Sequence, residues 1–423
     1  MLGKRKSNFF NASQAVAAST LTFEQDLELF VSQFIKSVGN FGFEQVILPP
    51  VEEAKIFLKT PRLEKHFNGK LFKIPEAGKQ ELVLCPTHTF SIIRKYLETL
   101  KVRGPHVAKW FYFSPLLNLE DNKYVVSYEL GIFVLGEDSH LANTQVINTV
   151  FEVFQQLGMP EFVVELNSLG CKSCQKDYEN VLVDHLAKYS FDLCADCRES
   201  FEKDPFVVWN CENSICRQQL AAAPQIVDFL DESCKSVLMG ILESIDDLSI
   251  PYILNPTLSL PLLREKVLFR VVASDAPGVV LGQGGNYTSL SRHLQEEDPV
   301  PVLGFLISPE KLLPHTSSEK VRAGIRDEVF IVSLGDIGTR RAMRLYRELK
   351  AAGITVAESM LSSAGIKNQF KEAASRHCEL SLIIGQKEAL EETVILRDMR
   401  SGMQEIFASD RIIEEIKKRL GKQ

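Results

Sequence analysis

The sequence predicts a protein of two successive domains: an α+β domain built around an antiparallel sheet, followed by a smaller α/β domain. The chain has 423 residues, more than one hydrophobic core usually serves. In residues 1–320, short strand patterns follow one another and helical patterns stand apart from them, which is typical of an antiparallel α+β domain. In residues 327–423, strand and helix patterns alternate, as they do in α/β units.

The first domain is predicted to open with an amphipathic helix. Thr22-Phe23-Glu24-Gln25 matches a capping box, and apolar residues then recur at helical spacing as far as Gly39. A short strand closed by prolines follows within residues 41–50. Further strands are expected at 71–74, 81–84, 110–113, 125–135 and 161–166, and helices at 90–100 and 143–157.

A helical, cysteine-bearing insertion is predicted within this domain at residues 171–245, with strands after it at 258–273 and 278–281. The domain boundary is expected within 314–327, where Pro-His-Thr-Ser-Ser interrupts the apolar pattern. In the C-terminal domain, strands are predicted at 328–334, 354–357, 380–384 and 393–397, and helices at 339–352 and 367–376.

Composition narrows the class of protein. The content of 45% hydrophobic and 24% charged residues is that of a globular protein. The sequence has no long apolar run and no signal-like start, so we expect a cytoplasmic protein without a membrane partner. The net charge of −7 argues against bulk attraction to phosphates. Residues 327–423 carry 16 Lys and Arg against 15 Asp and Glu, whereas the preceding residues carry 32 against 40, so a polyanion is expected to meet the C-terminal domain.

The nine cysteines are predicted to include a structural zinc site. Two C-x₂-C pairs 19 residues apart have a spacing that suits four thiolates around zinc. These ligands are Cys171, Cys174, Cys194 and Cys197. The alternative is that small apolar thiols pack between helices. Cys211 and Cys216 form a third pair whose role stays open, and Cys85, Cys234 and Cys378 are predicted to be core residues.

Ordered blocks along the chain resemble one family, the histidyl-tRNA synthetases of class II. The blocks are Phe41-Gly42-Phe43 with Pro49 and Glu52, then ELNSLGC at 165–171, Gly284-Gly285-Asn286-Tyr287, and segments at 349–354, 365–371, 383–385 and 397–402. They cover about residues 22–413 in the family's order. The resemblance implies a class II synthetase domain, an anticodon-binding domain, a homodimer paired through the first motif region, and tRNA as a partner.

Positions that run aminoacylation in this family carry other residues here. Cations must stand near the ATP phosphates, because negative charge concentrates there in the transition state. The resemblance places the motif 2 arginine on Asn118 and the motif 3 arginine on Lys311, which cannot form a bidentate fork. It places the substrate-binding glutamate on Thr87 and the start of the histidine-specific segment on Leu260. Arg264 or Arg270 could replace the arginine of the histidine-specific segment only if the alignment with the family is shifted along the sequence. The sequence therefore predicts loss of aminoacylation.

Several retained residues are candidates for a remnant amino-acid or nucleotide pocket. They are Glu52, Glu120, Glu129, Gly284, Gly285 and Tyr287. The alternative is that the carboxylates are ordinary surface groups, the tyrosine is half-buried and the glycines serve turns.

In the C-terminal domain, polar and cationic side chains are candidates for tRNA contact, because donors that converge there can bind phosphates or splayed bases. They are Lys367, Asn368, Gln369, Lys371, Arg397 and Arg400. The alternative is a solvated helix face.

Three functions are compatible with these observations. The favoured one is a synthetase-like paralogue that lacks aminoacylation and binds tRNA, a small ligand or a partner protein. The second is a divergent active histidine–tRNA ligase, which would need ATP and Mg²⁺. The third resembles the regulatory subunit of ATP phosphoribosyltransferase; residues 328–413 count against it, because that subunit typically lacks an anticodon domain.

Overall fold

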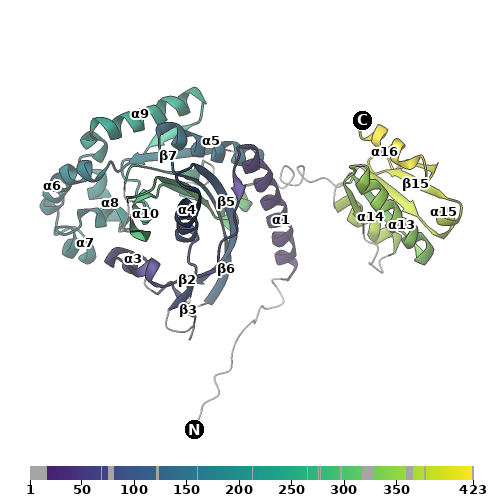
Figure 1. Cartoon of the computed structure of the whole chain (residues 1–423), viewed down its shortest axis with the longest axis horizontal. Coiled ribbons are helices and arrows are strands. Elements are labelled where there is room, and N and C mark those ends of the chain that lie inside the picture. The colour runs from purple at the N-terminus through teal and green to yellow at the C-terminus, as the bar shows by residue number, and fades with distance from the viewer. Residues whose placement is uncertain are drawn as a thin grey trace, which may run out of the picture. The chain divides into compact units, whose positions relative to one another are not determined.

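The structure is a computed structural model of the chain. It describes residues 17–67, 69–74, 81–120, 123–159, 161–211, 213–263, 265–274, 276, 278–295, 298–316, 328–358, 365–375 and 378–421. The chain divides into two compact units, Met1–Val321 and Arg322–Gln423, and each unit is described by itself (Figure 1). Within the described residues, no helix has the length and apolar character needed to cross a membrane.

An eight-stranded sheet forms the centre of the first unit, in the order β1-β5-β6-β11-β10-β9-β7-β8. The strands are β1 (Glu44–Gln45), β5 (Ala108–Glu120), β6 (Lys123–Leu135), β7 (Phe162–Ser168), β8 (Tyr252–Leu254), β9 (Val267–Ala273), β10 (Val280–Asn286) and β11 (Val302–Ile307). The inner pairs are antiparallel, and the edge strands β1 and β8 pair in parallel with β5 and β7. The predicted antiparallel α+β architecture is confirmed.

Helices cover both faces of this sheet, because consecutive apolar residues of its inner strands, such as Leu268 and Phe269, point to opposite faces. One face packs against α1 (Ala17–Asn40), α5 (His140–Gln156) and α9 (Glu232–Asp247), in a core that includes Phe34, Phe154 and Phe305. The other packs against α4 (Thr89–Arg103) and α10 (Thr288–Leu294). The predicted capping box is wrong, because α1 begins at Ala17 and Thr22 lies inside the helix.

Smaller elements complete this unit. A second sheet of order β2-β4-β3 contains β2 (Val51–Glu53), β3 (Phe72–Ile74) and β4 (Leu82–Leu84), and α2 (Lys55–Leu58) and α3 (Pro61–Phe67) accompany it. Near the end of the unit, α11 (Pro309–Leu312) and η3 (Leu313–His315) follow β11. The Glu310 carboxylate joins α11 to β6 by accepting a hydrogen bond from the Tyr128 backbone N–H at 2.6 Å.

The insertion is helical, as predicted. It contains α6 (Lys172–Lys188), α7 (Ala195–Ser200), η1 (Pro205–Asn210), α8 (Ser214–Ala221) and η2 (Ile226–Phe229), and it leads into α9. Figure 1 shows α6, α7 and α8 gathered at one side of the first unit. Their shared core includes Tyr178, Trp209 and Leu220.

The second unit is an α/β domain with a five-stranded sheet of order β13-β12-β14-β15-β16. Its strands are β12 (Val329–Ser333), β13 (Val356–Glu358), β14 (Leu380–Ile384), β15 (Thr393–Asp398) and β16 (Gln404–Ala408). Its helices are α13 (Gly335–Ala351), α14 (Ile366–Ser375), α15 (Gln386–Leu390) and α16 (Ile412–Arg419). Apolar residues of α13 and α16 pack on one face of the sheet, and those of α14 pack on the other.

Candidate functional site

A buried network of hydrogen bonds surrounds the carboxylate of Glu129, one of the pocket candidates. Glu129 lies on β6 and accepts hydrogen bonds from the Tyr112 hydroxyl at 2.7 Å, the His88 backbone N–H at 2.9 Å and the Thr87 hydroxyl at 3.1 Å. Tyr112 comes from β5, and Thr87 and His88 lie in the turn before α4. Thr89, the first residue of α4, donates its backbone N–H to the Thr87 hydroxyl at 3.3 Å.

This network is closed to solvent. Thr87, His88, Tyr112, Glu129 and Tyr287 are all buried. Burial raises the pKa of Glu129 and raises the pKa of Tyr112 well above its usual value. Burial also lowers the pKa of His88 to about 4, because an imidazolium would be poorly solvated there. Since Glu129 already accepts hydrogen bonds from three donors of the chain, a ligand amine would have to compete with them for this buried carboxylate.

The three other positions that the resemblance assigns to catalysis carry side chains that are engaged in structural contacts or exposed. Asn118 lies on β5, and its side-chain amide donates to the Ser127 hydroxyl at 2.6 Å across the β5–β6 pair. Leu260 is buried in the apolar core beneath the insertion. Lys311 is exposed on α11. None of these three side chains therefore supplies a fixed cation to the described face of the sheet.

Cations close to the candidate carboxylates are paired. The Arg94 guanidinium lies 2.6 Å from Glu52, so the pocket candidate Glu52 is a buried ion-pair partner. Arg270 on β9 lies 2.8 Å from Glu165, its direct neighbour on β7. An arginine held in this pair would have to leave Glu165 before it could bind a substrate carboxylate. Arg264 and the Glu120 side chain lie outside the described residues.

Gly284 and Gly285 lie inside strand β10 and not in a turn. A Cβ atom on Gly284 would approach the Gly304 carbonyl oxygen to 2.0 Å, and one on Gly285 would approach the Val267 carbonyl oxygen to 2.5 Å. Gly285 also has φ +143°, a conformation that L side chains rarely adopt. Both glycines therefore allow close packing of β9, β10 and β11. Tyr287, predicted as half-buried in the alternative interpretation, is fully buried beside Phe133.

The structure divides the four predicted zinc ligands between two clusters. Cys194 and Cys197 lie with Cys211 and Cys216, whereas Cys171 and Cys174 lie with Asp231 and Cys234. Within each cluster, the four possible ligand atoms lie within 4.8 Å of one another. The predicted set of four is therefore not one site, and Cys234 belongs to a cluster instead of standing alone. Cys85 and Cys378 are buried core residues.

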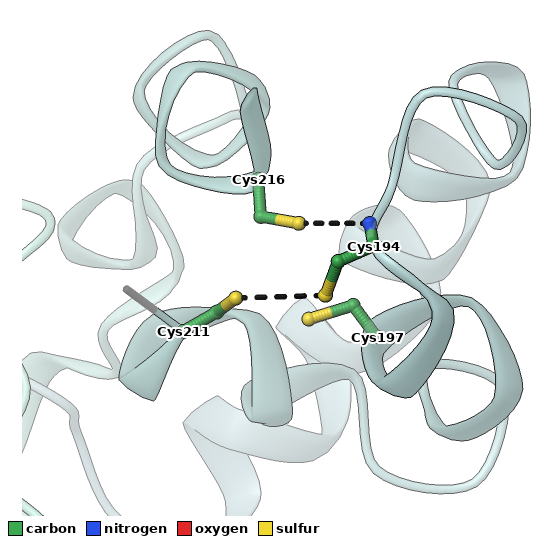
Figure 2. A group of neighbouring side chains, drawn as sticks. All are labelled: Cys194, Cys197, Cys211 and Cys216. Carbon is green, nitrogen blue, oxygen red and sulfur yellow. Dashed lines mark hydrogen bonds between the residues drawn. The ribbon is translucent and has the colours of Figure 1, made fainter. Parts of the chain in front are cut away.

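Figure 2 shows the four-cysteine cluster, with side chains from α7, the end of η1 and α8 turned towards one another. The sulfur atoms of Cys194 and Cys211 are 3.7 Å apart, and the Cys194 backbone N–H donates to Cys216 Sγ at 3.2 Å. Burial raises the pKa of Cys197 and Cys216, so a bound cation would have to displace their protons. Sulfur atoms at the usual Zn–S distance in a tetrahedron lie about 3.8 Å apart, so the cluster can hold a metal ion of that size.

The predicted tRNA contacts separate into two groups. Lys367, Asn368 and Lys371 are exposed on α14, and Arg400 is exposed in the turn after β15. Gln369 is buried, where its amide bonds the N–H and C=O of Ser333 at 3.0 Å each. Gln369 is therefore a structural residue. The Arg397 guanidinium stacks over the Phe370 ring at 4.7 Å, which orders it on the α14 side of the sheet.

Sequence reasoning missed two features of the C-terminal domain. Arg340, Arg344 and Arg347 form an exposed basic stripe on α13, which their spacing of four and three residues would have indicated. Strand β16 was also missed. On it, Ile406 pairs with Ile395 and is 69% exposed, so α14 leaves part of this sheet face open beside Arg397.

Comparisons with known proteins match this architecture. A family model described as anticodon binding domain matches residues 328–419. The histidine–tRNA ligase of Aquifex aeolicus is 29% identical over 375 residues, which cover 87% of this chain and 91% of that protein. The histidine–tRNA ligase of Desulfitobacterium hafniense is 27% identical over 392 residues, with 90% of each protein covered.

Solved structures show the same fold. The apo histidyl-tRNA synthetase of S. aureus has a TM-score of 0.67 at 22% identity and covers 98% of this chain and 100% of its own. A Bacillus halodurans protein described as an ATP phosphoribosyltransferase regulatory subunit/histidyl-tRNA synthetase has a TM-score of 0.58 at 17% identity. It covers 91% of this chain and 98% of its own. These similarities confirm a class II synthetase-like fold with a C-terminal anticodon-binding domain.

Proposed function

We propose that this chain, a member of the histidyl-tRNA synthetase-like family, binds tRNA through its C-terminal domain and does not activate histidine. The proposal that the chain does not activate histidine rests on the buried hydrogen-bond network around Glu129. A pocket for an amino acid needs polar groups that are free to meet the ligand, and here the side chains of Thr87, Tyr112 and Glu129 bond one another, whereas only the His88 ring nitrogen Nδ1 is buried without a hydrogen-bond partner in this group. The alternative function, a divergent active ligase with ATP and Mg²⁺, requires this network to open.

The absence of fixed cations at the replaced positions supports the same proposal. Adenylate formation concentrates negative charge on the transferring phosphate, and an amide such as that of Asn118 supplies no compensating charge. Lys311 keeps a positive charge, but its compact ammonium does not reproduce the guanidinium fork. Arg270 could replace the missing arginine if the alignment with the family were shifted, but its guanidinium is held in an ion pair with Glu165.

The α14 side of the C-terminal sheet is the surface that we infer for tRNA. Lys367 and Lys371 stand one turn apart on the exposed face of α14, where both ammonium groups can meet phosphates. Arg397, stacked on Phe370, and the exposed Ile406 lie on the same face of the sheet. Planar guanidinium groups and open apolar surface suit unstacked bases.

Exchanging Lys367 and Lys371 for alanine in the full chain should weaken binding of bulk tRNA about tenfold and reduce the salt slope of log K by about 2. The measurement is filter binding at several salt concentrations. Arg344→Ala with Arg347→Ala is the matched control, because it removes the same charge from α13 on the opposite face. Equal losses in both double variants would contradict the α14 surface, and a wild-type chain that binds no tRNA would remove the proposal.

We also propose zinc in the cluster of Cys194, Cys197, Cys211 and Cys216. Four thiols suit a closed structural zinc site, which does no chemistry itself. An ion there would join α7, η1 and α8, three short elements that also share the core around Trp209 and Leu220. The nine free cysteines fit the cytoplasm, where thiols stay reduced, and we propose that compartment for the protein.

The protein should form a homodimer through the edge of the large sheet at β1. Ile47, just after β1, is 87% exposed, and Val102 near the end of α4 and Val107 just before β5 are 86% and 55% exposed, although all three are apolar. Light scattering should give twice the 47.6 kDa chain mass, and Ile47→Glu should shift the protein towards the monomer. Phe191→Glu is the control, because Phe191 is 89% exposed but lies in the insertion. A monomeric wild-type protein would contradict this proposal.

A further inference from the structure

The second cysteine cluster lies where the insertion leaves and rejoins the rest of its unit. Strand β7 ends at Ser168, and three residues later Cys171 occupies the N-cap position of α6. Asp231 caps the N-terminus of α9, whose apolar face packs in the core with α5. The cluster therefore joins the first helix of the insertion to the helix that follows it.

The ligand atoms are close enough for one metal ion. The sulfur atoms of Cys171 and Cys174 are 3.6 Å apart, and Cys171 Sγ lies 3.1 Å from Asp231 Oδ2. Together with Cys234 Sγ, these atoms all lie within 4.8 Å of one another. In a tetrahedral zinc site, neighbouring sulfurs lie about 3.8 Å apart, and a sulfur and an oxygen slightly closer. The sulfur–sulfur separation is also far longer than a disulfide bond of about 2.05 Å.

The two clusters share one local design. In each, a C-x₂-C pair starts a helix: Cys194 and Cys197 on α7, and Cys171 and Cys174 on α6. In each, a backbone N–H from another ligand residue donates to a cysteine sulfur at 3.2 Å: Cys194 N to Cys216, and Asp231 N to Cys174. Such N–H donors stabilise thiolate charge, which is the form that binds metals.

Asp231 makes its own pair with Cys234. Aspartate and cysteine three residues apart at the start of α9 repeat the geometry of C-x₂-C, with a carboxylate as the first ligand. Asp231 Oδ1 accepts the Cys234 backbone N–H at 2.7 Å as the helix cap, and Oδ2 faces Cys171. The N-termini of two helices, 17 and 16 residues long, thus converge on one anionic group of ligands, which their dipoles favour.

The chain packs closely around the cluster at Gly170, where a larger residue would not fit. Gly170 has φ +61°, and a Cβ atom there would lie 2.5 Å from Cys174 Cβ and 2.9 Å from Leu230 Cδ2. Backbone hydrogen bonds from Leu169 to Lys266 and from Lys266 to Gly170, of 2.8 and 2.7 Å, fix this turn against the start of β9. The first two ligands are therefore held in place before any ion binds.

We propose that Cys171, Cys174, Asp231 and Cys234 form a second zinc site, which fastens the N-termini of α6 and α9 together at the base of the insertion. This site has three thiolates and a carboxylate, whereas the first cluster has four thiolates. Asp231 is exposed, and Cys171 and Cys234 are partly exposed. The second site therefore releases its ion to a chelator before the four-cysteine site does.

The test is the metal content of the full chain together with its cobalt spectrum. Wild-type protein should contain about two zinc ions per chain, Cys234→Ala and Cys216→Ala should each contain about one, and Cys85→Ala, which removes a buried thiol outside both clusters, should keep two. A colorimetric chelator should remove zinc from wild type in two phases, of which Cys234→Ala lacks the fast one. After cobalt exchange, the sulfur-to-cobalt absorbance of Cys234→Ala should fall to that of the four-thiolate site alone.

Asp231→Asn separates metal binding from helix capping, because asparagine caps a helix as well as aspartate does but binds zinc weakly. It should speed the fast phase at least tenfold and leave the slow phase unchanged. One zinc ion per chain that Cys234→Ala does not alter would overturn the second site while leaving the four-cysteine site standing. A Cys171–Cys174 disulfide in protein purified without oxidant, with only one zinc ion, would assign the pair to redox chemistry and equally overturn the proposal.

Discussion

Purified protein should exchange no pyrophosphate into ATP in the presence of histidine and Mg²⁺ beyond the rate without histidine. Asn118 donates to Ser127 and carries no charge, Leu260 is buried in the core, and Glu129 already accepts hydrogen bonds from Thr87, His88 and Tyr112. Each missing charge removes about 3 kcal/mol of transition-state stabilisation, so two of them lower the rate by roughly 10⁴. The exchange reaction measures activation alone and does not depend on tRNA.

The substitution Asn118→Arg should not restore exchange by itself. Thr87 would still stand at the substrate-binding position, hydrogen-bonded to Glu129, and Leu260 would still occupy the histidine-specific segment. A histidine–tRNA ligase with the complete family motifs provides the positive control. Histidine-dependent exchange by the wild-type chain would establish the divergent ligase and make Lys311 and Arg270 catalytic candidates. Restoration by the single change would show that the pocket opens more readily than its hydrogen bonds indicate.

Cys216→Ala should lose the zinc of the four-cysteine cluster and lower the melting temperature of the protein by roughly 6 °C. An ion at a free concentration near 1,000 times its Kd contributes about 4 kcal/mol to the folded state. The entropy of unfolding is about 2.1 cal/mol/K per residue, so in the unit Met1–Val321 a change of 1 kcal/mol corresponds to about 1.5 °C. Zinc analysis and calorimetry, each with and without a chelator, measure the two effects.

Cys85→Ala is the control for this loss. Cys85 and Cys216 are both buried, and each substitution removes one sulfur from the core, but Cys85 belongs to neither cluster. The control should keep its zinc and show no chelator-dependent change in melting temperature beyond that of wild type. If Cys216→Ala melts like wild type and wild type is insensitive to chelator, the thiols are packing residues, as the alternative interpretation of the sequence holds.

Local pattern was sufficient for most elements of the fold. The predicted helices at 90–100 and 143–157 correspond to α4 and α5, because an apolar stripe at helical spacing must be buried wherever the helix packs. The strand pattern at 125–135 corresponds to β6, although β5 extends well beyond the predicted 110–113. Its extension follows from the long pairing with β6 as far as Glu120, which depends on the partner strand and not on the residues of β5 alone.

The sequence predicted the exposure of some candidate site residues correctly and that of others wrongly. Lys367 and Lys371 are exposed on a helix as their pattern indicates, but Gln369 between them is buried against Ser333. A helix places residues two positions apart on different faces, so the orientation of α14 on the sheet decided which of them meet solvent. The sequence favours turns for Gly284 and Gly285, which lie in strand β10, because glycine alone does not distinguish a turn from a closely packed strand.

By itself, the sequence indicated the class II synthetase-like architecture with its anticodon-binding domain, the cysteine pairs at the helix starts, and the uncharged residues at the two positions, Asn118 and Leu260, that the resemblance assigns to cations. These properties depend on residue identity and on spacings of three or four positions, which a helical turn converts directly into proximity. Only the tertiary structure decided which pairs meet. Cys171 lies 60 positions before Asp231, its partner across the second cluster, and contacts over that separation are set by how α6 and α9 pack. In the same way, the packing of β5, β6 and α4 decided that Glu129 is enclosed by Thr87, His88 and Tyr112.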